Sequence, residues 1–215
     1  MSTISHASTS KYWQYALWLA LFTIFYNLAE GLISVFFGVQ DEALTLLGFG
    51  IDSFIEVMSG IGILAMVLRI RQNPDTPRST FERTALRVTG VSFYLLAAGL
   101  AVTSAYNLWI GHKPTTTLPG LVISLVSILV MWALVMGKHK VGEVLNSAPI
   151  HADANCTRVC IYMSIVLLVA SLIYQVTGFG YADVIGAVGL IYFSISEGRE
   201  AFEKSSSLND GCDDC

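Results

Sequence analysis

Charged residues are scarce in this sequence. Asp, Glu, Lys and Arg make up only 13% of its 215 residues, whereas hydrophobic residues make up 54%. Soluble globular domains typically contain about 25% charged residues, so this composition excludes an ordinary soluble domain and indicates a membrane protein.

Further absences narrow the function. The sequence has no G-x-x-x-x-G-K-[ST] motif for nucleotide phosphates, so we expect a proton gradient to be the energy source. We also expect that the protein is not an enzyme and that it has no cofactor. The net charge of -4 argues against a nucleic-acid partner. The first ten residues lack the charged n-region of a signal peptide, and the apolar run that follows is too long for one. We therefore expect the first helix to stay in the protein.

Long apolar runs dominate what is present. Three runs without acidic or basic residues, 88–111, 115–137 and 159–182, can each cross the roughly 30 Å hydrocarbon layer as a helix. Three more runs contain acids or are short: 12–38, 43–68 and 184–196. The sequence therefore predicts an all-α polytopic membrane protein with six transmembrane helices. Its expected parts are an N-terminal segment 1–11, a transmembrane transport domain 12–204, and a short Cys/Asp tail 205–215.

Most basic residues lie at the helix ends that are expected on one side of the membrane. They follow the second, fourth and sixth runs: Arg69, Arg71, Arg78, Arg83, Lys138, Lys140, Arg199 and Lys204. The opposite side has essentially Lys113 alone. By the positive-inside rule, both termini are cytoplasmic, and the protein is a multi-pass protein of the cell membrane with the lipid bilayer as a partner.

Acidic residues interrupt the run 43–68 near its middle. Asp52 and Glu56 lie one helical turn apart on the same face, where each acid costs about 2.5 to 3.5 kcal/mol to insert. Ion pairs between helices would need a Lys or Arg at the same depth, and we expect none there, so a cation-binding cavity is favoured. A polar stripe on the first helix supports such a cavity: Thr23, Asn27, Glu30 and Ser34.

The segment "HADANCTRVC", residues 151–160, adds thiols at the start of the fifth helix. At about 100° per residue, Asp153, Cys156, Cys160 and Met163 share one face, whereas Arg158 lies about 160° from both cysteines. Two i, i+4 pairs that face each other, Asp52 with Glu56 and Cys156 with Cys160, would supply four ligands to a tetrahedral cation. Buried cysteines also serve as small apolar residues. Asp153 is either an acid at the helix N-terminus or an entrance ligand.

Three segments together resemble the transmembrane domain of the cation diffusion facilitator family: "GFGIDSFIEV", "ADANCTRVC" and "YADVIGAVGLIYFSISEGREAF". In that family the second helix carries Asp-x-x-x-Asp, and Glu56 replaces its second Asp here. The fifth helix of the family reads Ala-Asp-x-x-His-x-x-x-Asp, which places Cys156 on the His and Cys160 on the Asp. A rival register would use His151 and Asn155 instead.

The resemblance extends to about Lys204 and has two departures. The family's usual cytoplasmic C-terminal domain and its His-rich loop before the fifth helix are not found in the sequence. The resemblance implies a homodimer, but the domain that helps to form it is missing. The tail "GCDDC" contains Cys212 and Cys215, which are either further metal ligands or part of an unstructured end.

The resemblance and the ligands together predict a secondary transporter. We expect it to export a divalent transition metal, Zn²⁺ or another thiophilic ion, by metal/proton antiport, because thiol ligands favour soft or borderline ions. The expected metal ligands are Asp52, Glu56, Cys156 and Cys160. Four ionised ligands would exceed the charge of one divalent ion, so we expect the empty site to hold protons that the metal displaces. The alternatives are a membrane thiol-redox protein and a metal-binding membrane subunit that does not transport.

Overall fold

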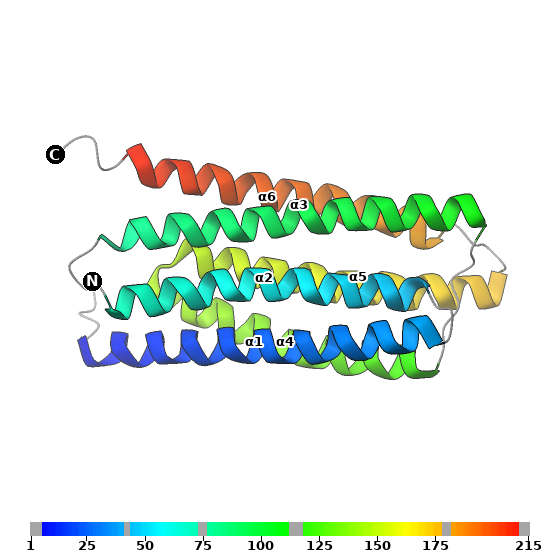
Figure 1. Ribbon diagram of the computed structural model, residues 1–215, viewed down its shortest axis with the longest axis horizontal. Helices are drawn as coiled ribbons and strands as arrows, with labels where there is room; N and C mark the ends of the chain where they lie inside the picture. The colour runs from blue at the N-terminus through cyan, green and yellow to red at the C-terminus, as the bar shows by residue number, and fades with distance from the viewer. Residues whose placement is uncertain (1–5, 41–43, 73–76, 112–117, 178–181, 211–215) are drawn as a thin grey trace.

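The computed structural model describes residues 6–40, 44–72, 77–111, 118–177 and 182–210 (Figure 1). These residues form six helices: α1 His6–Gln40, α2 Leu44–Gln72, α3 Arg78–Ile110, α4 Leu118–Leu145, α5 Ala148–Thr177 and α6 Ala182–Asp210. No strand occurs within the described ranges. The predicted all-α fold with six helices is confirmed.

The outer surface of the bundle is apolar, and its interior combines apolar clusters with buried polar side chains. Large side chains such as Trp18, Phe25 and Trp132 are exposed, whereas Thr23 and Asn27 are buried. By length and composition, four helices in the described ranges contain segments that can cross a membrane: Ser10–Gln40, Gly48–Gln72, Ser79–Ile110 and Leu121–Leu145. A bundle in lipid exposes its apolar side chains and turns its polar ones inward, which is the arrangement observed here.

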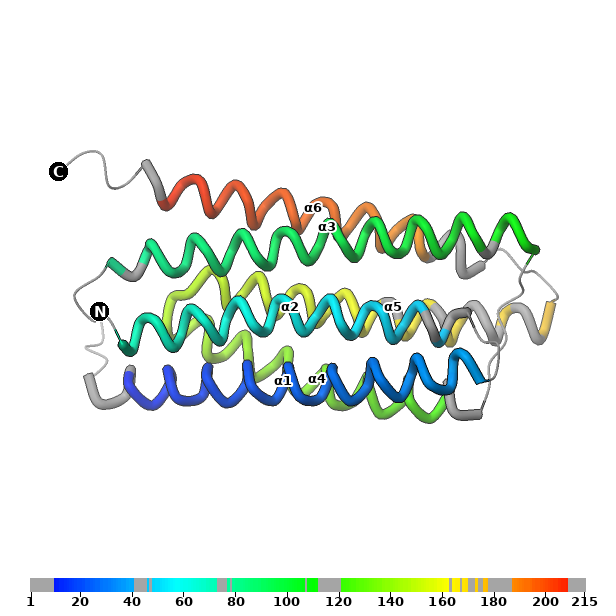
Figure 2. The backbone as a smooth tube through the Cα atoms, in the orientation of Figure 1, coloured from blue at the N-terminus to red at the C-terminus, as the bar shows by residue number. Residues whose placement is uncertain are grey.

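The helices pack in pairs along the bundle. α1 packs on α2, α3 on α6, and α4 on α5, and α5 also contacts α2 and α3. Figure 2 shows α1 with α4 behind it, and these two helices are in contact. The start of α1 and the end of α6 lie at the same end of the bundle (Figure 1), in agreement with the prediction that both termini are on one side.

Glycines allow two of these pairs to approach closely. A Cβ atom added to Gly50 of α2 would lie 3.0 Å from the carbonyl oxygen of Gly31 in α1 and 2.8 Å from Cγ2 of Val35. A Cβ added to Gly90 of α3 would lie 3.4 Å from the carbonyl oxygen of Gly198 in α6. The approach of α1 to α2 brings Glu30 next to the turn of α2 that contains Asp52 and Glu56.

The cytoplasmic ends of α3 and α6 are held together by polar contacts. Nε of Arg87 donates to the hydroxyl of Ser205 at 3.2 Å, and the guanidinium of Arg83 donates to the carbonyl of Leu208 at 3.2 Å. Ser205 is buried against α3, and α6 continues beyond residue 204 to Asp210. The predicted tail ligands Cys212 and Cys215 lie outside the described residues.

Candidate cation-binding site

Asp52 and Glu56 both point into the bundle, as their spacing predicts. Their side chains are 4% and 0% exposed, respectively. On the same helix, Ser53 and Ser59 are also buried. A helix in lipid buries the face that carries its polar groups, so the intervals of three and four residues between these positions determine which face of α2 meets the other helices.

The two predicted thiol ligands flank these acids. Cys160 interacts with the carboxyl groups of both Asp52 and Glu56, and Cys156 lies within electrostatic range of both. Both cysteines are buried and free of disulfides. They belong to different apolar clusters, however: Cys160 packs with Met131 of α4, and Cys156 packs beside α3. The two thiols therefore have different apolar neighbours.

Within the part of the chain that the structure describes, two carboxyl oxygens of this site lack a hydrogen-bond partner. Among the described residues, nothing donates to Oδ1 of Asp52 or to Oε2 of Glu56, and both atoms are inaccessible to solvent. Buried polar atoms are almost always paired, so each unpaired oxygen calls for a proton, a water molecule or a cation. A cation held between the two acids would satisfy both oxygens.

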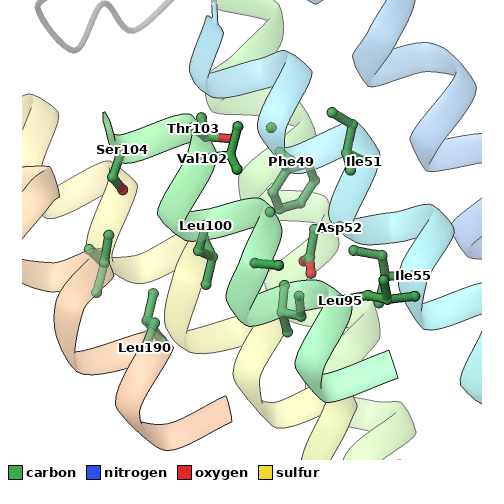
Figure 3. Close-up of a pocket in the computed structure, with 16 residues that line it drawn as sticks. Phe49, Ile51, Asp52, Ile55, Leu95, Leu100, Val102, Thr103, Ser104 and Leu190 are labelled. Carbon is green, nitrogen blue, oxygen red and sulfur yellow. The ribbon is translucent and has the colours of Figure 1, made fainter. Parts of the chain in front are cut away.

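A cavity of about 450 Å³ reaches Asp52. Its walls come from α2, α3, α5 and α6, and most of the lining side chains are apolar. Figure 3 shows the Asp52 carboxyl among Phe49, Ile55 and Leu95, with Thr103 and Ser104 farther along α3. Asp52 is therefore the charged group that a cation in this cavity would meet.

The prediction that no Lys or Arg lies at the depth of the acids is wrong, because α4 places Lys138 among them. The Lys138 side chain is 2% exposed, and its Nζ lies 2.8 Å from Oδ2 of Asp153 and 3.8 Å from Oε1 of Glu56. It also donates to the hydroxyl of Thr157 at 2.8 Å. A buried ammonium needs such partners to offset the loss of hydration. Lys138 is therefore not part of the cytoplasmic charge cluster, whereas Lys140 is exposed.

Asp153 is a member of the same buried ion-pair network. Its Oδ1 accepts from the Ser59 hydroxyl at 2.6 Å, and Ser59 in turn contacts the hydroxyl of Thr89 in α3 at 3.1 Å. Thr157, one turn farther along α5, donates to Oε1 of Glu56. Asp153 thus joins α5 to α2 and α4 deep in the bundle, instead of standing at the helix entrance.

The polar stripe on α1 is confirmed, and its acid belongs to the same interior. Glu30 accepts hydrogen bonds from the hydroxyls of Tyr26 and Ser53, both at 3.1 Å, and it also interacts with Ser127 of α4. Ser53 directly follows Asp52, so the Glu30 carboxyl lies within electrostatic range of the α2 acids. Glu30 is therefore stabilised by neutral hydroxyl donors, whereas Glu56 is stabilised by the positive charge of Lys138.

The residues of the rival register have partners elsewhere. His151 contacts His139 of α4 at 3.3 Å, and Arg158 also contacts His139, on the side of α5 that we predicted for it. Asn155 donates to Glu197 of α6 at 2.7 Å. The side chain of Met163 lies outside the described residues. His151 and Asn155 thus link α5 to two different helices.

Thr157 gives a direct test of the buried network. We expect Thr157→Val to lower the free energy of unfolding by about 1 to 3 kcal/mol, because it leaves the ammonium of Lys138 and the carboxyl of Glu56 each short of a hydrogen bond. The measurement is the midpoint of thermal unfolding in detergent. Thr84→Val, at an exposed position of α3, is the matched control. Equal shifts in the two variants would contradict the network.

The described residues do not form a closed metal site: within them, no three His, Cys, Asp or Glu side chains are placed to hold one ion together. Comparison with known families nevertheless gives a match over most of the chain. The family model of the cation efflux transmembrane domain matches residues 18–208. A search among curated proteins finds no match. The matched region includes the acids of α1 and α2, Lys138, and both cysteines of α5.

Proposed function

Because the chain belongs to the cation efflux family, and is therefore a multi-pass membrane protein that transports a metal cation, we propose that it exports Zn²⁺ in exchange for protons. The residues proposed to bind the ion are Asp52, Glu56, Cys156 and Cys160. The bound ion is the substrate, so we propose no resident cofactor. We further propose that residues 12–204, with the remainder of α6, form the transport unit and that it works as a homodimer.

The observation that supports this site is the pair of unpaired, fully buried oxygens on Asp52 and Glu56, with the Cys160 thiol interacting with both carboxyls. Oxygen and sulfur ligands together suit a borderline ion such as Zn²⁺ better than Mg²⁺ or Ca²⁺. Entry of the ion would draw these side chains closer, since they do not surround a common point in the described residues.

Proton exchange follows from the chemistry of the ligands. A thiol binds metal as a thiolate, and a carboxyl binds as a carboxylate, so metal that enters a buried site displaces the protons held there. Charges left without compensation in this apolar interior would be costly. Protons that return from the opposite side would therefore favour release of the ion, which couples the two flows.

The experiment is uptake of Zn²⁺ by proteoliposomes with and without an imposed pH gradient. We expect the steady-state accumulation of Zn²⁺ to rise about tenfold for each exchanged proton when protons flow opposite to the metal down a gradient of one pH unit, since one pH unit corresponds to about 1.4 kcal/mol per proton. The double variant Asp52→Ala and Cys160→Ala sets the baseline. Flux that ignores the gradient would rule out the antiport.

The same preparations separate the two alternatives. A metal-binding subunit would bind Zn²⁺ in equilibrium dialysis without gradient-driven uptake. A thiol-redox protein would form a disulfide between Cys156 and Cys160 under mild oxidation, detectable by loss of both free thiols, and would retain its redox cycle in Asp52→Ala. The free, buried state of both thiols gives no support to the redox function.

A further inference from the structure

We infer that the ammonium of Lys138 occupies a second cation site, formed by Asp153, Glu56 and Thr157, and thereby limits the protein to one transported ion. This inference rests on the proposed function, because it concerns the cations that the same interior accepts. The second site contains only oxygen ligands, so its chemistry suits a hard cation such as Mn²⁺ or Mg²⁺.

The contacts of Lys138 are those of a cation site. Its Nζ lies 2.8 Å from Oδ2 of Asp153, 2.8 Å from the hydroxyl of Thr157 and 3.8 Å from Oε1 of Glu56. The acids and the hydroxyl come from two helices, α2 and α5, and the ammonium comes from a third, α4. Three oxygens that converge on one positive charge in a water-excluded interior are the donor set of a bound cation.

Glu56 connects this second site to the proposed zinc site. Its Oε1 faces Thr157 and Lys138, whereas its Oε2 has no partner among the described residues. One carboxyl group thus lies between the ammonium on one side and the proposed position of the metal on the other. The fixed positive charge of Lys138 therefore acts on the neighbouring ion and also fills the oxygen-only site.

The position of Lys138 on the inward face of α4 explains how its side chain remains buried. Buried residues before and after it on the same face of α4, Met131, Leu134, Val141 and Leu145, pack against neighbouring helices. The long aliphatic part of the lysine continues this apolar face, and only the ammonium group reaches the acids. Lys140, two residues away, points outward and has an exposed side chain.

The test is binding of Mn²⁺ to purified protein in detergent, followed by electron paramagnetic resonance of the bound ion. We expect Lys138→Met to bind one Mn²⁺ that the wild type does not bind, and we expect the matched control Lys140→Met to behave as the wild type. Lys138→Arg, which keeps the positive charge, should gain no Mn²⁺. Adding Asp153→Asn to Lys138→Met should abolish the new signal, because it removes the nearest oxygen anion.

A second variant covers the case in which Lys138→Met does not fold. Asp153→Asn alone leaves the ammonium of Lys138 with Glu56 as its remaining anion, so the ammonium moves toward Glu56 and the proposed zinc site. We expect Zn²⁺ to bind about tenfold more weakly or worse, because two positive charges repel each other strongly in a medium of low dielectric. Unchanged Zn²⁺ affinity in Asp153→Asn, or absence of a Mn²⁺ signal in folded Lys138→Met, would overturn the inference. Failure of the wild type to bind Zn²⁺ would instead contradict the proposed function.

Discussion

Asp52→Asn should reduce Zn²⁺ uptake into proteoliposomes by at least about 100-fold, since removing even a supporting group of a metal site typically costs 10- to 100-fold. The substitution preserves the size of the side chain but removes the negative charge that faces the cavity. It also replaces an unpaired carboxylate oxygen by an amide group. Initial rates of uptake and equilibrium dialysis with Zn²⁺ measure transport and binding separately, and we expect both to fall.

The control for this prediction is an acid remote from the site. Glu203 of α6 is exposed and forms an ion pair with Arg199 at 2.7 Å on the surface of the same helix. Exposed pairs of this kind contribute little to stability, so Glu203→Gln should transport as the wild type does. If Asp52→Asn retained more than a tenth of the wild-type rate, the ion would have to pass without this carboxylate.

Gly50→Leu should destabilise the bundle strongly. The new side chain would have to displace the backbone of α1, because a Cβ at this position already lies 3.0 Å from the carbonyl oxygen of Gly31. Overpacking of this kind costs about 3 kcal/mol or more when backbone must move. For a protein of this size, that lowers the midpoint of thermal unfolding by roughly 6 to 12 °C. Thermal unfolding of the purified protein in detergent measures the shift.

The matched control is another helical glycine with open space around it. A Cβ added to Gly99 of α3 meets no atom of the described residues within 4 Å. Gly99→Leu should therefore unfold within a few degrees of the wild type and express at a similar level. If Gly50→Leu yields no folded protein after purification, that outcome also agrees with the predicted destabilisation. Equal midpoints for the two variants would show that α1 and α2 can separate at little cost.

The sequence predicts the helices and most of their inward faces. Apolar runs interrupted by polar residues at intervals of three and four identify both the number of helices and the side of each that avoids lipid. Asp52, Glu56 and the stripe on α1 were predicted in this way. These predictions depend on local spacing within one helix. Because a polar group in hydrocarbon is costly, that spacing determines which side of the helix faces the bundle.

Lys138 was missed because its immediate neighbours suggested a different location. It precedes His139 and Lys140 at the end of an apolar run, where basic residues normally mark the cytoplasmic interface. The signal that identifies it is the longer pattern of α4, in which Lys138 falls in line with Leu134 and Val141. A single basic residue on the apolar face of a helix indicates an acid on a neighbouring helix.

The relation between the thiols and the acids also required the structure. Cys156 and Cys160 share a face of α5, as predicted, but positions four apart differ by about 40° around a helix. That difference directs the thiols into different apolar clusters. Spacing within one helix does not determine how a second helix is placed against it, so convergence of the two pairs on one ion remains a prediction.

The two faces of α1 restrict how this transporter can move. Trp18, Phe22 and Phe25 project outward, and Asn27 and Glu30 project inward from the same helix. Turning α1 about its long axis would drive the amide and the carboxyl into hydrocarbon and bring the aromatic rings against the hydroxyls of α2 and α4. During the transport cycle α1 therefore cannot rotate far about its own axis without exposing these polar groups to lipid.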